Sequence, residues 1–409
     1  MKTSIRWGRN ALAACAATLL SWTAAANGPA APPKLPAIPT DWTKFENLPP
    51  VTVGNTQYEA TCSAYPGTDP KFSFWAKRGK VNNVVVYFEG GGACWDNLTC
   101  TFPIGSGLPD PAPQFYMAAI PPAANPAAYD GIFKTDSANP VKDWSFVYIP
   151  YCSGDLHLGS AKKNYSNAGN PLLPATFDIQ HRGFDNFMVV LDWMRNNFRS
   201  PQTILVAGSS AGGYGAAGNF PYLKETYPNA HMHVVADASQ GVTTVAFDQG
   251  NPGRNSWNPQ LAPWIYGTDS SWVPGPDILR YAAEYYPRVK VSQFTTNFDN
   301  VQIGFYGVMK QFYGPGGACP NPAVDWNQQM LSTLTAYVGN VNNFRHYVAG
   351  GTYHTLLRSP VFYTEASGGI KFADWMTGML KSQGGTGGSG GLPWSNRACP
   401  TCLAPLSCP

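Results

Sequence analysis

The chain has 409 residues, of which 44% are hydrophobic and 12% are charged. This composition is too apolar for a disordered chain, and the length suits one large α/β domain or two modest ones. Of the 27 Lys and Arg residues, three lie in the first 26 positions, so the remaining 24 balance the 24 Asp and Glu residues. A neutral chain gives no indication of nucleic-acid binding or of electrostatic capture by a membrane.

Residues 1–26 have the features of a secretory signal peptide. Three cations precede an apolar run at 11–20, and alanines at 24–26 offer a cleavage site near Ala26. The residues up to Cys15 also resemble a lipoprotein cleavage box, but the apolar run lies mostly after that cysteine, so a lipid anchor is the less favoured interpretation. No later segment has the ~18 uninterrupted apolar residues of a membrane span, so we expect an exported chain without stable membrane insertion.

The mature chain divides into three parts by composition. Residues 27–40 are rich in Ala and Pro and form a predicted extended leader. We expect one catalytic domain over residues 41–383. Residues 384–409 begin as a flexible Gly/Ser linker and end as a Cys-rich tail, which we expect disulfides to attach to the domain.

Nine cysteines are present, and removal of the predicted signal peptide removes Cys15. The even number that remains in an exported chain predicts disulfides. These residues are Cys62, Cys94, Cys100, Cys152, Cys319, Cys399, Cys402 and Cys408. Cys94 and Cys100 form the best local pair, and the sequence does not fix the other pairings. Cys399 and Cys402 also have the spacing of half a zinc site, but no second Cys or His pair has a matching spacing, so we predict no metal.

Short β-branched and aromatic runs predict the strands. In chain order they are 51–61, 71–77, 83–89, 144–151, 203–208, 233–238, 289–295 and 344–348. The first two runs suit a pair of antiparallel strands at the beginning of the domain. The later runs are almost continuously apolar, as in strands covered on both faces. Between them, apolar residues recur at steps of three and four from Phe184 to Phe198, which predicts a helix. Strands alternating with helices predict an α/β fold with a mostly parallel central sheet and helices on both faces.

Two long segments have no clear element. Residues 101–140 are dense in Pro and Ala, and residues 249–276 carry Trp257, Trp264 and Trp272 among Pro, Gly and Asn. Long loops in a domain are commonly lids or binding loops. The three tryptophans suit stacking on sugar rings or an acyl site, although packing is the commoner role of such residues.

A Gly-x-Ser-x-Gly string occupies residues 208–212 and has Ser210 at its centre. The string alone is weak evidence, because Gly and Ser often meet in loops. Here it follows the strand-like run 203–207 and precedes small residues at 213–218, which are able to open a helix packed closely on a sheet. This setting is that of the nucleophile elbow of the α/β-hydrolase fold, so we predict that Ser210 is a nucleophile.

A serine hydroxyl needs a histidine base, which follows the nucleophile in the chain order of this fold. Four histidines follow Ser210. His231 and His233 come too soon after the elbow for an acid to precede them. His346 lies inside the last predicted strand, where a buried imidazole without a catalytic role is the simpler interpretation. His354 lies in the loop beyond that strand and is the predicted base.

The acid that orients this base belongs after the preceding strand. Asp299 follows the run 289–295 and is the predicted acid. Asp237 and Asp248 are its rivals. Asp237 ends the strand after the elbow, which is an alternative location for the acid, but a carboxylate there more often binds loop amides.

An oxyanion hole needs N–H donors, one of them normally from the residue after the nucleophile, here Ala211. The run 83–88 leads into Glu89 and three glycines, a bend of the kind that supplies the other donors. We predict the amides of Gly92 and Ala93 in this role. A glycine-rich loop also cradles phosphate in other proteins, but the Gly-Lys-Ser/Thr ending of such loops does not follow here.

These segments resemble the pectin acetylesterase / Notum family of carboxylesterases. The resemblance is carried by residues 88–94, 150–155, 208–213 and 298–303 and by the histidine at His354. It implies an α/β-hydrolase fold and the same triad and oxyanion donors that the residues themselves indicate.

Two departures from the family pattern concern the substrate. Family members commonly have a tryptophan where Ala93 stands, and Asp155 is followed here by Leu156, His157, Leu158 and Gly159. The smaller Ala93 predicts a roomier acyl pocket beside the reacting carbonyl, so acetyl specificity does not follow from the resemblance.

The sequence therefore predicts a secreted serine carboxylesterase that forms an acyl-enzyme on Ser210 without a cofactor or metal. The favoured substrate is an acylated polysaccharide, as for a pectin acetylesterase. The alternative is an esterase, lipase or depolymerase that acts on a lipid or polyester. A non-catalytic binding protein on a hydrolase scaffold is the minor alternative, which predicts an incomplete triad. We expect a monomer that binds its ester substrate and no nucleic acid.

Overall fold

The computed structural model describes residues 35–105, 113–381, 394–404 and 406–408. The predicted signal peptide, most of the predicted leader and the predicted Gly/Ser linker lie outside these ranges. Within the described part of the chain, no helix is long and apolar enough to cross a membrane.

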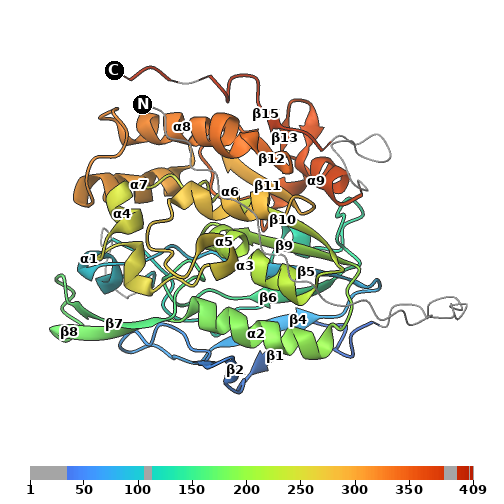
Figure 1. Ribbon diagram of the computed structural model, residues 1–409, viewed down its shortest axis with the longest axis horizontal. Coiled ribbons are helices and arrows are strands. Elements are labelled where there is room, and N and C mark those ends of the chain that lie inside the picture. The colour runs from blue at the N-terminus through green and yellow to red at the C-terminus, as the bar shows by residue number, and fades with distance from the viewer. Residues whose placement is uncertain (1–34, 106–112, 382–393, 405, 409) are drawn as a thin grey trace, which may run out of the picture. The chain divides into compact units, whose positions relative to one another are not determined.

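A nine-stranded sheet forms the centre of the fold (Figure 1). Its strands are β1 (Thr43–Glu46), β4 (Ser73–Lys77), β5 (Asn83–Phe88), β6 (Ser145–Ile149), β9 (Thr203–Ser209), β10 (His231–Asp237), β11 (Lys290–Thr296), β12 (Phe344–Ala349) and β15 (Arg397–Ala398). Their order is β1-β4-β6-β5-β9-β10-β11-β12-β15. Neighbours from β6 to β15 pair in parallel, whereas β4 runs antiparallel to β1 and β6. The sheet is mostly parallel, as predicted.

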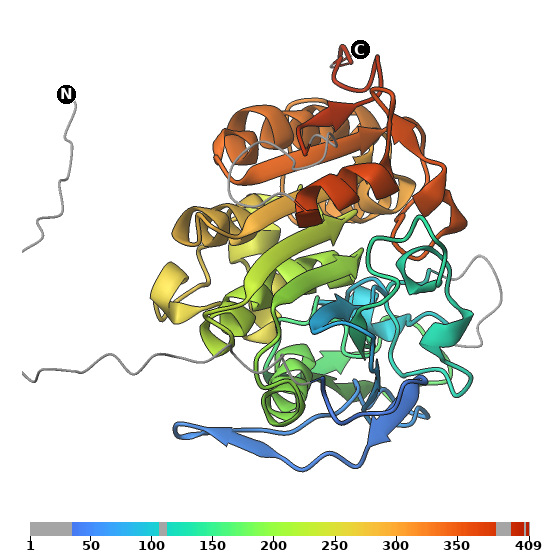
Figure 2. The same cartoon turned by 90° about the vertical axis from the view of Figure 1, so that its right-hand side faces the viewer.

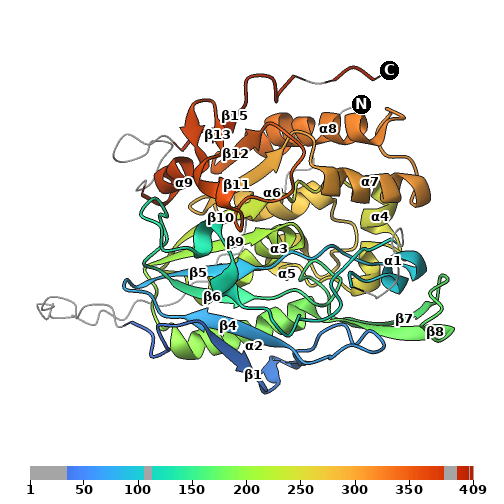
Figure 3. The same cartoon turned by 180° about the vertical axis from the view of Figure 1, so that it is seen from behind.

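Helices cover both faces of this sheet, which confirms the predicted architecture (Figures 1, 2 and 3). They are α1 (Asn97–Thr101), α2 (Gly183–Asn197), α3 (Ala211–Thr226), α4 (Val245–Gln249), α5 (Pro263–Tyr266), α6 (Gly275–Tyr285), α7 (Asn300–Phe312), α8 (Pro322–Ser332) and α9 (Phe372–Lys381). Residues of α2, α3, α6 and α8 share one core with strand residues such as Val84 and Val206. Residues of α9 share the other core with Val85 and Leu205. Successive strand residues thus enter opposite cores, which explains why the central strands are apolar throughout.

The first strands of the domain differ from the prediction. The sequence predicts one strand over 51–61 that pairs with a strand over 71–77. Gly54, with a φ of +60°, and Asn55 form a two-residue turn. This turn separates β2 (Val51–Val53) from β3 (Thr56–Tyr58), and the two strands form a hairpin of their own. β4 pairs instead with β1 and β6.

Two further pairs of short strands lie outside the central sheet. β7 (Ala161–Ser166) and β8 (Thr176–His181) form a hairpin beside α1, as Figures 1 and 3 show. β13 (Ala366–Ser367) pairs with β14 (Ile370–Lys371). Most residues of β7 are exposed or half-exposed and polar, so it has little of the apolar pattern from which a strand is predicted.

Four disulfides join the eight cysteines of the predicted mature chain. They are Cys62–Cys152, Cys94–Cys100, Cys319–Cys408 and Cys399–Cys402. The predicted local pair is confirmed, and the Cys399–Cys402 disulfide excludes the zinc interpretation of that motif. The tail is also attached by β15, which pairs with β12.

We expect the Cys62–Cys152 disulfide to contribute most of its stability by restricting the unfolded chain. Its cysteines are 90 positions apart, against 3 for Cys399–Cys402. Replacing both members of the first pair by Ser should lower the free energy of unfolding by about 4 kcal/mol, and the same change in the second pair by less than about 2 kcal/mol. Urea titrations of the two variants measure this difference, and equal losses would contradict the chain-entropy explanation.

Four histidines are buried in the fold, namely His157, His181, His233 and His346. Burial lowers the pKa of His157 and His346 to about 4, and that of His181 and His233 to about 3. The unfolded chain therefore binds protons on these rings at a higher pH than the folded chain. The contribution of the neutral rings to the free energy of unfolding is fully present above pH ~6.5. It is lost as the pH falls towards the pKa values of the rings in the folded chain.

We expect His157→Gln to weaken this pH dependence. The His157 ring lies 2.8 Å from the Glu89 carbonyl, and a glutamine amide keeps a donor there without taking up a proton. Between about pH 6 and pH 5, the unfolding free energy of the variant should fall less steeply, by up to about 1.4 kcal/mol per pH unit. His231 is exposed, so His231→Gln is the control and should leave the slope unchanged. An unchanged slope in His157→Gln would show that this ring is not held neutral by burial.

Candidate functional site

Ser210 lies in a sharp turn between β9 and α3. Its backbone has a φ of +58° and a ψ of −126°, which residues other than Gly rarely adopt. Small neighbours permit this turn, because a Cβ at Gly212 would lie 2.0 Å from the carbonyl oxygen of Phe88. The amide of Ser210 donates to the Asp237 carbonyl at 2.7 Å, which fixes the turn against the neighbouring strand. The strand, turn and helix therefore lie as the sequence predicts.

Two of the predicted site residues are in direct contact. Nδ1 of His354 lies 2.8 Å from both carboxylate oxygens of Asp299. Asp299 is fully buried and also accepts hydrogen bonds from the amides of Val301 and Gln302 and from the Gln302 side chain, at 3.0 to 3.1 Å. These bonds hold the carboxylate in one orientation towards the imidazole.

Asp299 and His354 come from the loops that follow β11 and β12, which are neighbouring parallel strands. Backbone hydrogen bonds join the two loops. The amide of Phe298 donates to the Gly351 carbonyl, and the amide of Asn300 donates to the Thr352 carbonyl, both at 3.1 Å. The carboxyl ends of adjacent strands thus bring the two side chains together.

The second ring nitrogen of His354, Nε2, does not have a carboxylate partner as Nδ1 does. It is buried and makes no hydrogen bond to any residue that the structure describes. His354 and Ser210 line the same pocket. With the ring proton on Nδ1 towards Asp299, Nε2 is an acceptor, which is the form that takes a proton from a serine hydroxyl.

Asp237, the first rival for the acid, has other partners. Its buried carboxylate accepts hydrogen bonds from the Ser209 hydroxyl at 2.6 Å and from the amides of Leu356 and Leu357 at 2.9 to 3.1 Å. Burial raises the pKa of Asp237, while the hydrogen bonds from Leu357, Ser209 and Leu356 oppose this shift. Asp237 therefore connects the residue before Ser210 to the loop that carries His354.

The remaining candidates also have partners of their own. Asp248 accepts a hydrogen bond from the Thr243 hydroxyl at 2.6 Å and lies 3.5 Å from a guanidinium nitrogen of buried Arg254. His346 is buried in β12, with Nδ1 3.2 Å from the Leu334 carbonyl. Neither residue is bonded to Asp299 or Ser210 among the described contacts.

The glycine-rich bend lies beside the elbow, and Gly92, Ala93 and Ala211 line the same pocket as Ser210. The amide of Ala93 donates to the Phe115 carbonyl at 3.0 Å, so this N–H is not free for an oxyanion in the structure. This differs from the prediction, because the sequence does not reveal that the bend pairs with the segment around Phe115. The amide of Gly92 has no hydrogen bond to the described residues, and that of Ala211 lies in the first turn of α3, where N–H groups lack a helical acceptor.

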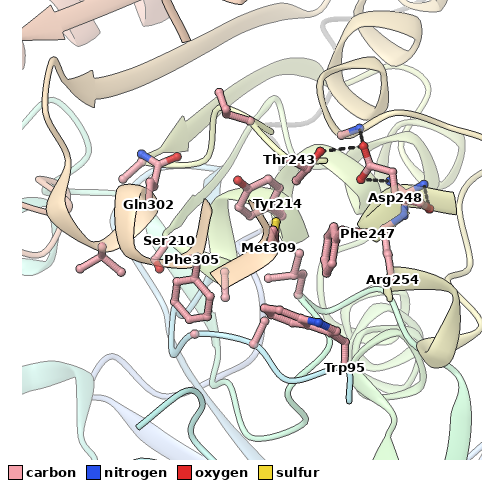
Figure 4. A pocket seen from close by; sticks show the side chains of 18 of the residues that line it. Trp95, Ser210, Tyr214, Thr243, Phe247, Asp248, Arg254, Gln302, Phe305 and Met309 are labelled. Atoms are coloured by element: carbon pink, nitrogen blue, oxygen red, sulfur yellow. Dashed lines mark hydrogen bonds and ion pairs between the residues drawn. The ribbon is translucent and has the colours of Figure 1, made fainter. Parts of the chain in front are cut away.

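The pocket at Ser210 is narrow and mostly apolar. Figure 4 shows Phe247 and Met309 between Ser210 at one end and the Asp248–Arg254 pair at the other. Its volume is about 70 Å³. By the same measure one water molecule needs roughly 10 to 15 Å³, so the pocket has space for a group about as large as five to seven water molecules.

Ala93 lines the pocket, as the sequence suggests. Ala93 packs in one cluster with Trp95, Phe247, Trp257 and Met309. Trp257 is fully buried and, like Trp264 and Trp272, does not line the pocket.

Sequence reasoning misses the residues that support the glycine-rich bend. Glu89 is buried, and its carboxylate accepts a hydrogen bond from Arg358 at 2.8 Å and from the Tyr151 amide at 3.2 Å. Its carbonyl accepts a hydrogen bond from the His157 ring. The signal in the sequence is Glu89 itself, since an acidic residue directly after an apolar strand needs partners if it is buried.

One group of potential metal ligands occurs among the described residues, namely Cys94, Cys100 and His181. The two cysteines are joined in a disulfide, so they offer no thiolate. The His181 ring contacts the Tyr165 hydroxyl at 2.8 Å and the Ser153 carbonyl at 3.0 Å. This group is therefore not a metal site.

Comparison with known proteins supports this interpretation of the fold. One relative is the palmitoleoyl-protein carboxylesterase Notum of Schmidtea mediterranea, which is 25% identical over 200 residues. The match covers 43% of this chain and 34% of that protein, so the chain spans about a third of the relative's length. The pectinacetylesterase family matches residues 46–251, which include the glycine-rich bend and Ser210 but neither Asp299 nor His354. With half of its length matched, and with the sheet and elbow described above, the chain belongs to the pectinacetylesterase family.

Proposed function

We propose that this chain hydrolyses carboxylic esters through an acyl-enzyme on Ser210. The observation that carries the proposal is the contact of His354 with Asp299, which leaves Nε2 as an acceptor in the pocket that Ser210 lines. Ser210 is the nucleophile, His354 the general base and Asp299 the acid that orients it. The family and the Notum relative, both with names of carboxylic ester hydrolases, support an esterase independently of this geometry.

The reaction proceeds in two steps. The Ser210 oxygen attacks the ester carbonyl carbon while its proton passes to Nε2 of His354, and Asp299 stabilises the resulting imidazolium. The amides of Gly92 and Ala211 stabilise the negative oxygen of the tetrahedral intermediate. The bond to the alcohol then breaks as His354 returns the proton to the leaving oxygen. Water, activated by His354, releases the acid from Ser210 in the same way.

The dimensions of the pocket favour a short acyl group. A volume of about 70 Å³, by the measure in which one water needs roughly 10 to 15 Å³, suits a short acyl chain. The buried Asp248–Arg254 pair closes the far end of the pocket (Figure 4). The relative is named for a palmitoleoyl group, which is far longer. We infer that this chain acts on esters of short acids.

The substrate that we propose is an acylated polysaccharide outside the cell. The family name and the small acyl pocket support deacetylation, and four disulfides suit an exported protein. The apolar lining of the pocket makes a short-chain lipid or polyester the alternative. Release of acetate from acetylated pectin or xylan, compared with hydrolysis of tributyrin, distinguishes these substrates.

We expect Ser210→Ala to lower kcat on p-nitrophenyl acetate by at least about 10⁴-fold, because the nucleophile is lost. Asp299→Asn should cost about 10⁴-fold, since an amide does not hold the same tautomer of His354. Asp325→Asn is the control, because Asp325 is a buried carboxylate that is paired with Lys310 and lies outside the pocket lining, so its loss should cost far less. Retained activity in Ser210→Ala, or an equal loss in Asp325→Asn, would refute these assignments.

We expect Phe305→Ala to extend the range of acyl groups, because Phe305 lines the pocket near Ser210 (Figure 4). The ratio of kcat/KM for p-nitrophenyl hexanoate to that for the acetate should rise at least about tenfold. Phe312→Ala is the control, since Phe312 lies on the same helix but is 54% exposed and outside the pocket. If neither variant changes the ratio, the acyl group binds elsewhere.

A further inference from the structure

The far end of the pocket at Ser210 is polar, although most of its walls are apolar. Figure 4 shows Asp248 and Arg254 beyond Phe247 and Met309. Asp248 and Arg254 both line the pocket, and their side chains are 6% and 2% exposed. A buried pair of charges is costly unless hydrogen bonds satisfy its remaining polar atoms. The partners of each atom therefore decide what this end of the pocket is able to bind.

The protein satisfies one side of each charged group. Oδ2 of Asp248 accepts hydrogen bonds from the Thr243 hydroxyl at 2.6 Å and from the Gly275 amide at 2.8 Å. Nη2 of Arg254 donates to the backbone carbonyls of Asp248 and Val273. These bonds hold both side chains in place at the end of the pocket.

The other side of each group has no partner. Oδ1 of Asp248 and both Nε and Nη1 of Arg254 are buried and make no hydrogen bond to any residue that the structure describes. Nη1 lies 3.5 Å from Oδ1, which is longer than the roughly 2.7 to 2.9 Å of a charge-assisted hydrogen bond. An unused acceptor and unused donors therefore lie next to each other on two residues that line the pocket.

We propose that this end of the pocket binds a hydroxyl group on the acyl chain, so that the preferred substrates are esters of short hydroxy acids. A hydroxyl group is able to donate its proton to Oδ1 of Asp248 and to accept a hydrogen bond from Nη1 or Nε of Arg254. The proposal rests on the proposed esterase function and names the class of acid that the reaction releases. An acetyl group also enters the pocket but has no atom to pair with these groups.

The charges at this end disfavour other groups on the acyl chain. A carboxylate there would lie against Asp248, and an ammonium would lie against Arg254, which in either case places like charges together in a buried site. A methyl group would leave the polar atoms unsatisfied. The volume of about 70 Å³, roughly that of five to seven water molecules, suits a chain of about four carbons with one hydroxyl.

Pairs of ethyl esters in which a methyl group replaces the hydroxyl test the proposal. Ethyl 3-hydroxybutanoate is compared with ethyl 3-methylbutanoate, and ethyl 4-hydroxybutanoate with ethyl pentanoate. Acid release in a pH-stat gives kcat/KM for each ester, and each ratio is divided by the ratio for alkaline hydrolysis without the protein. For at least one pair, this normalised ratio should favour the hydroxy ester about tenfold or more, because a site built to bind a hydroxyl rejects the analogue without it.

A double variant, Asp248→Leu with Arg254→Met, assigns the preference to the charged pair. Replacing a buried ion pair by apolar residues of similar volume is often neutral for stability. The normalised ratio should fall to about one or below, while the methyl esters are still hydrolysed. Lys310→Met with Asp325→Leu is the matched control, since it removes another largely buried pair that does not line the pocket, and it should leave the ratio unchanged. A hydroxyl preference that persists in the first double variant overturns the proposal.

If the first double variant does not fold, the position of the hydroxyl decides in the unaltered protein. A hydroxyl at C2 lies beside the reacting carbonyl, so ethyl 2-hydroxypropanoate should have no such advantage over ethyl 2-methylpropanoate. An equal advantage at C2, or no advantage for either of the longer hydroxy esters, overturns the role of the pair while hydrolysis of the methyl esters leaves the esterase intact. If none of these esters is hydrolysed, both proposals are overturned.

Discussion

The carboxylate of Asp237 holds the parts of the candidate site together. A buried carboxylate is costly unless its oxygens are hydrogen-bonded, and here the donors are the Ser209 hydroxyl and the amides of Leu356 and Leu357. Tyr87 extends the network, since its hydroxyl lies 2.7 Å from that of Ser209. A movement of the elbow away from the histidine loop would leave this charge without partners. The position of Ser210 relative to His354 is therefore tied to the folding of the core.

The strand order explains why Asp237 is able to act in this way. β10 lies between β9, which ends at the elbow, and β11, which precedes Asp299. β12 follows on the far side of β11 and leads to His354. Because these strands are parallel, the loops at their carboxyl ends meet at one edge of the sheet. Asp237, as the last residue of β10, lies between Ser210 and the two residues that we propose to activate it.

The sequence reveals those features that depend on local pattern and chain order. The order of residues alone shows the run before Ser210 and the glycines around it. It also shows that Asp299 and His354 each follow a predicted strand. The hairpin at Gly54 also has a local signal, since Gly-Asn between two β-branched runs is typical of a two-residue turn, and the prediction of one strand over 51–61 overlooks it. The bond from the Ala93 amide to Phe115 and the partners of Glu89 depend on segments far apart in the chain, which periodicity does not bring together.

The buried charges around the site are compensated in different ways. Asp248 is paired with Arg254, Glu89 with Arg358, and Asp237 with amide and hydroxyl donors. Asp299 instead contacts the ring of His354, which we propose as the general base. Arg358 differs from Arg254 in that its side chain is 31% exposed, whereas that of Arg254 is 2% exposed. The buried acids around the site are thus held by fixed donors or cations, whereas the proposed acid Asp299 faces the imidazole of His354, whose Nε2 has no hydrogen bond to the described residues.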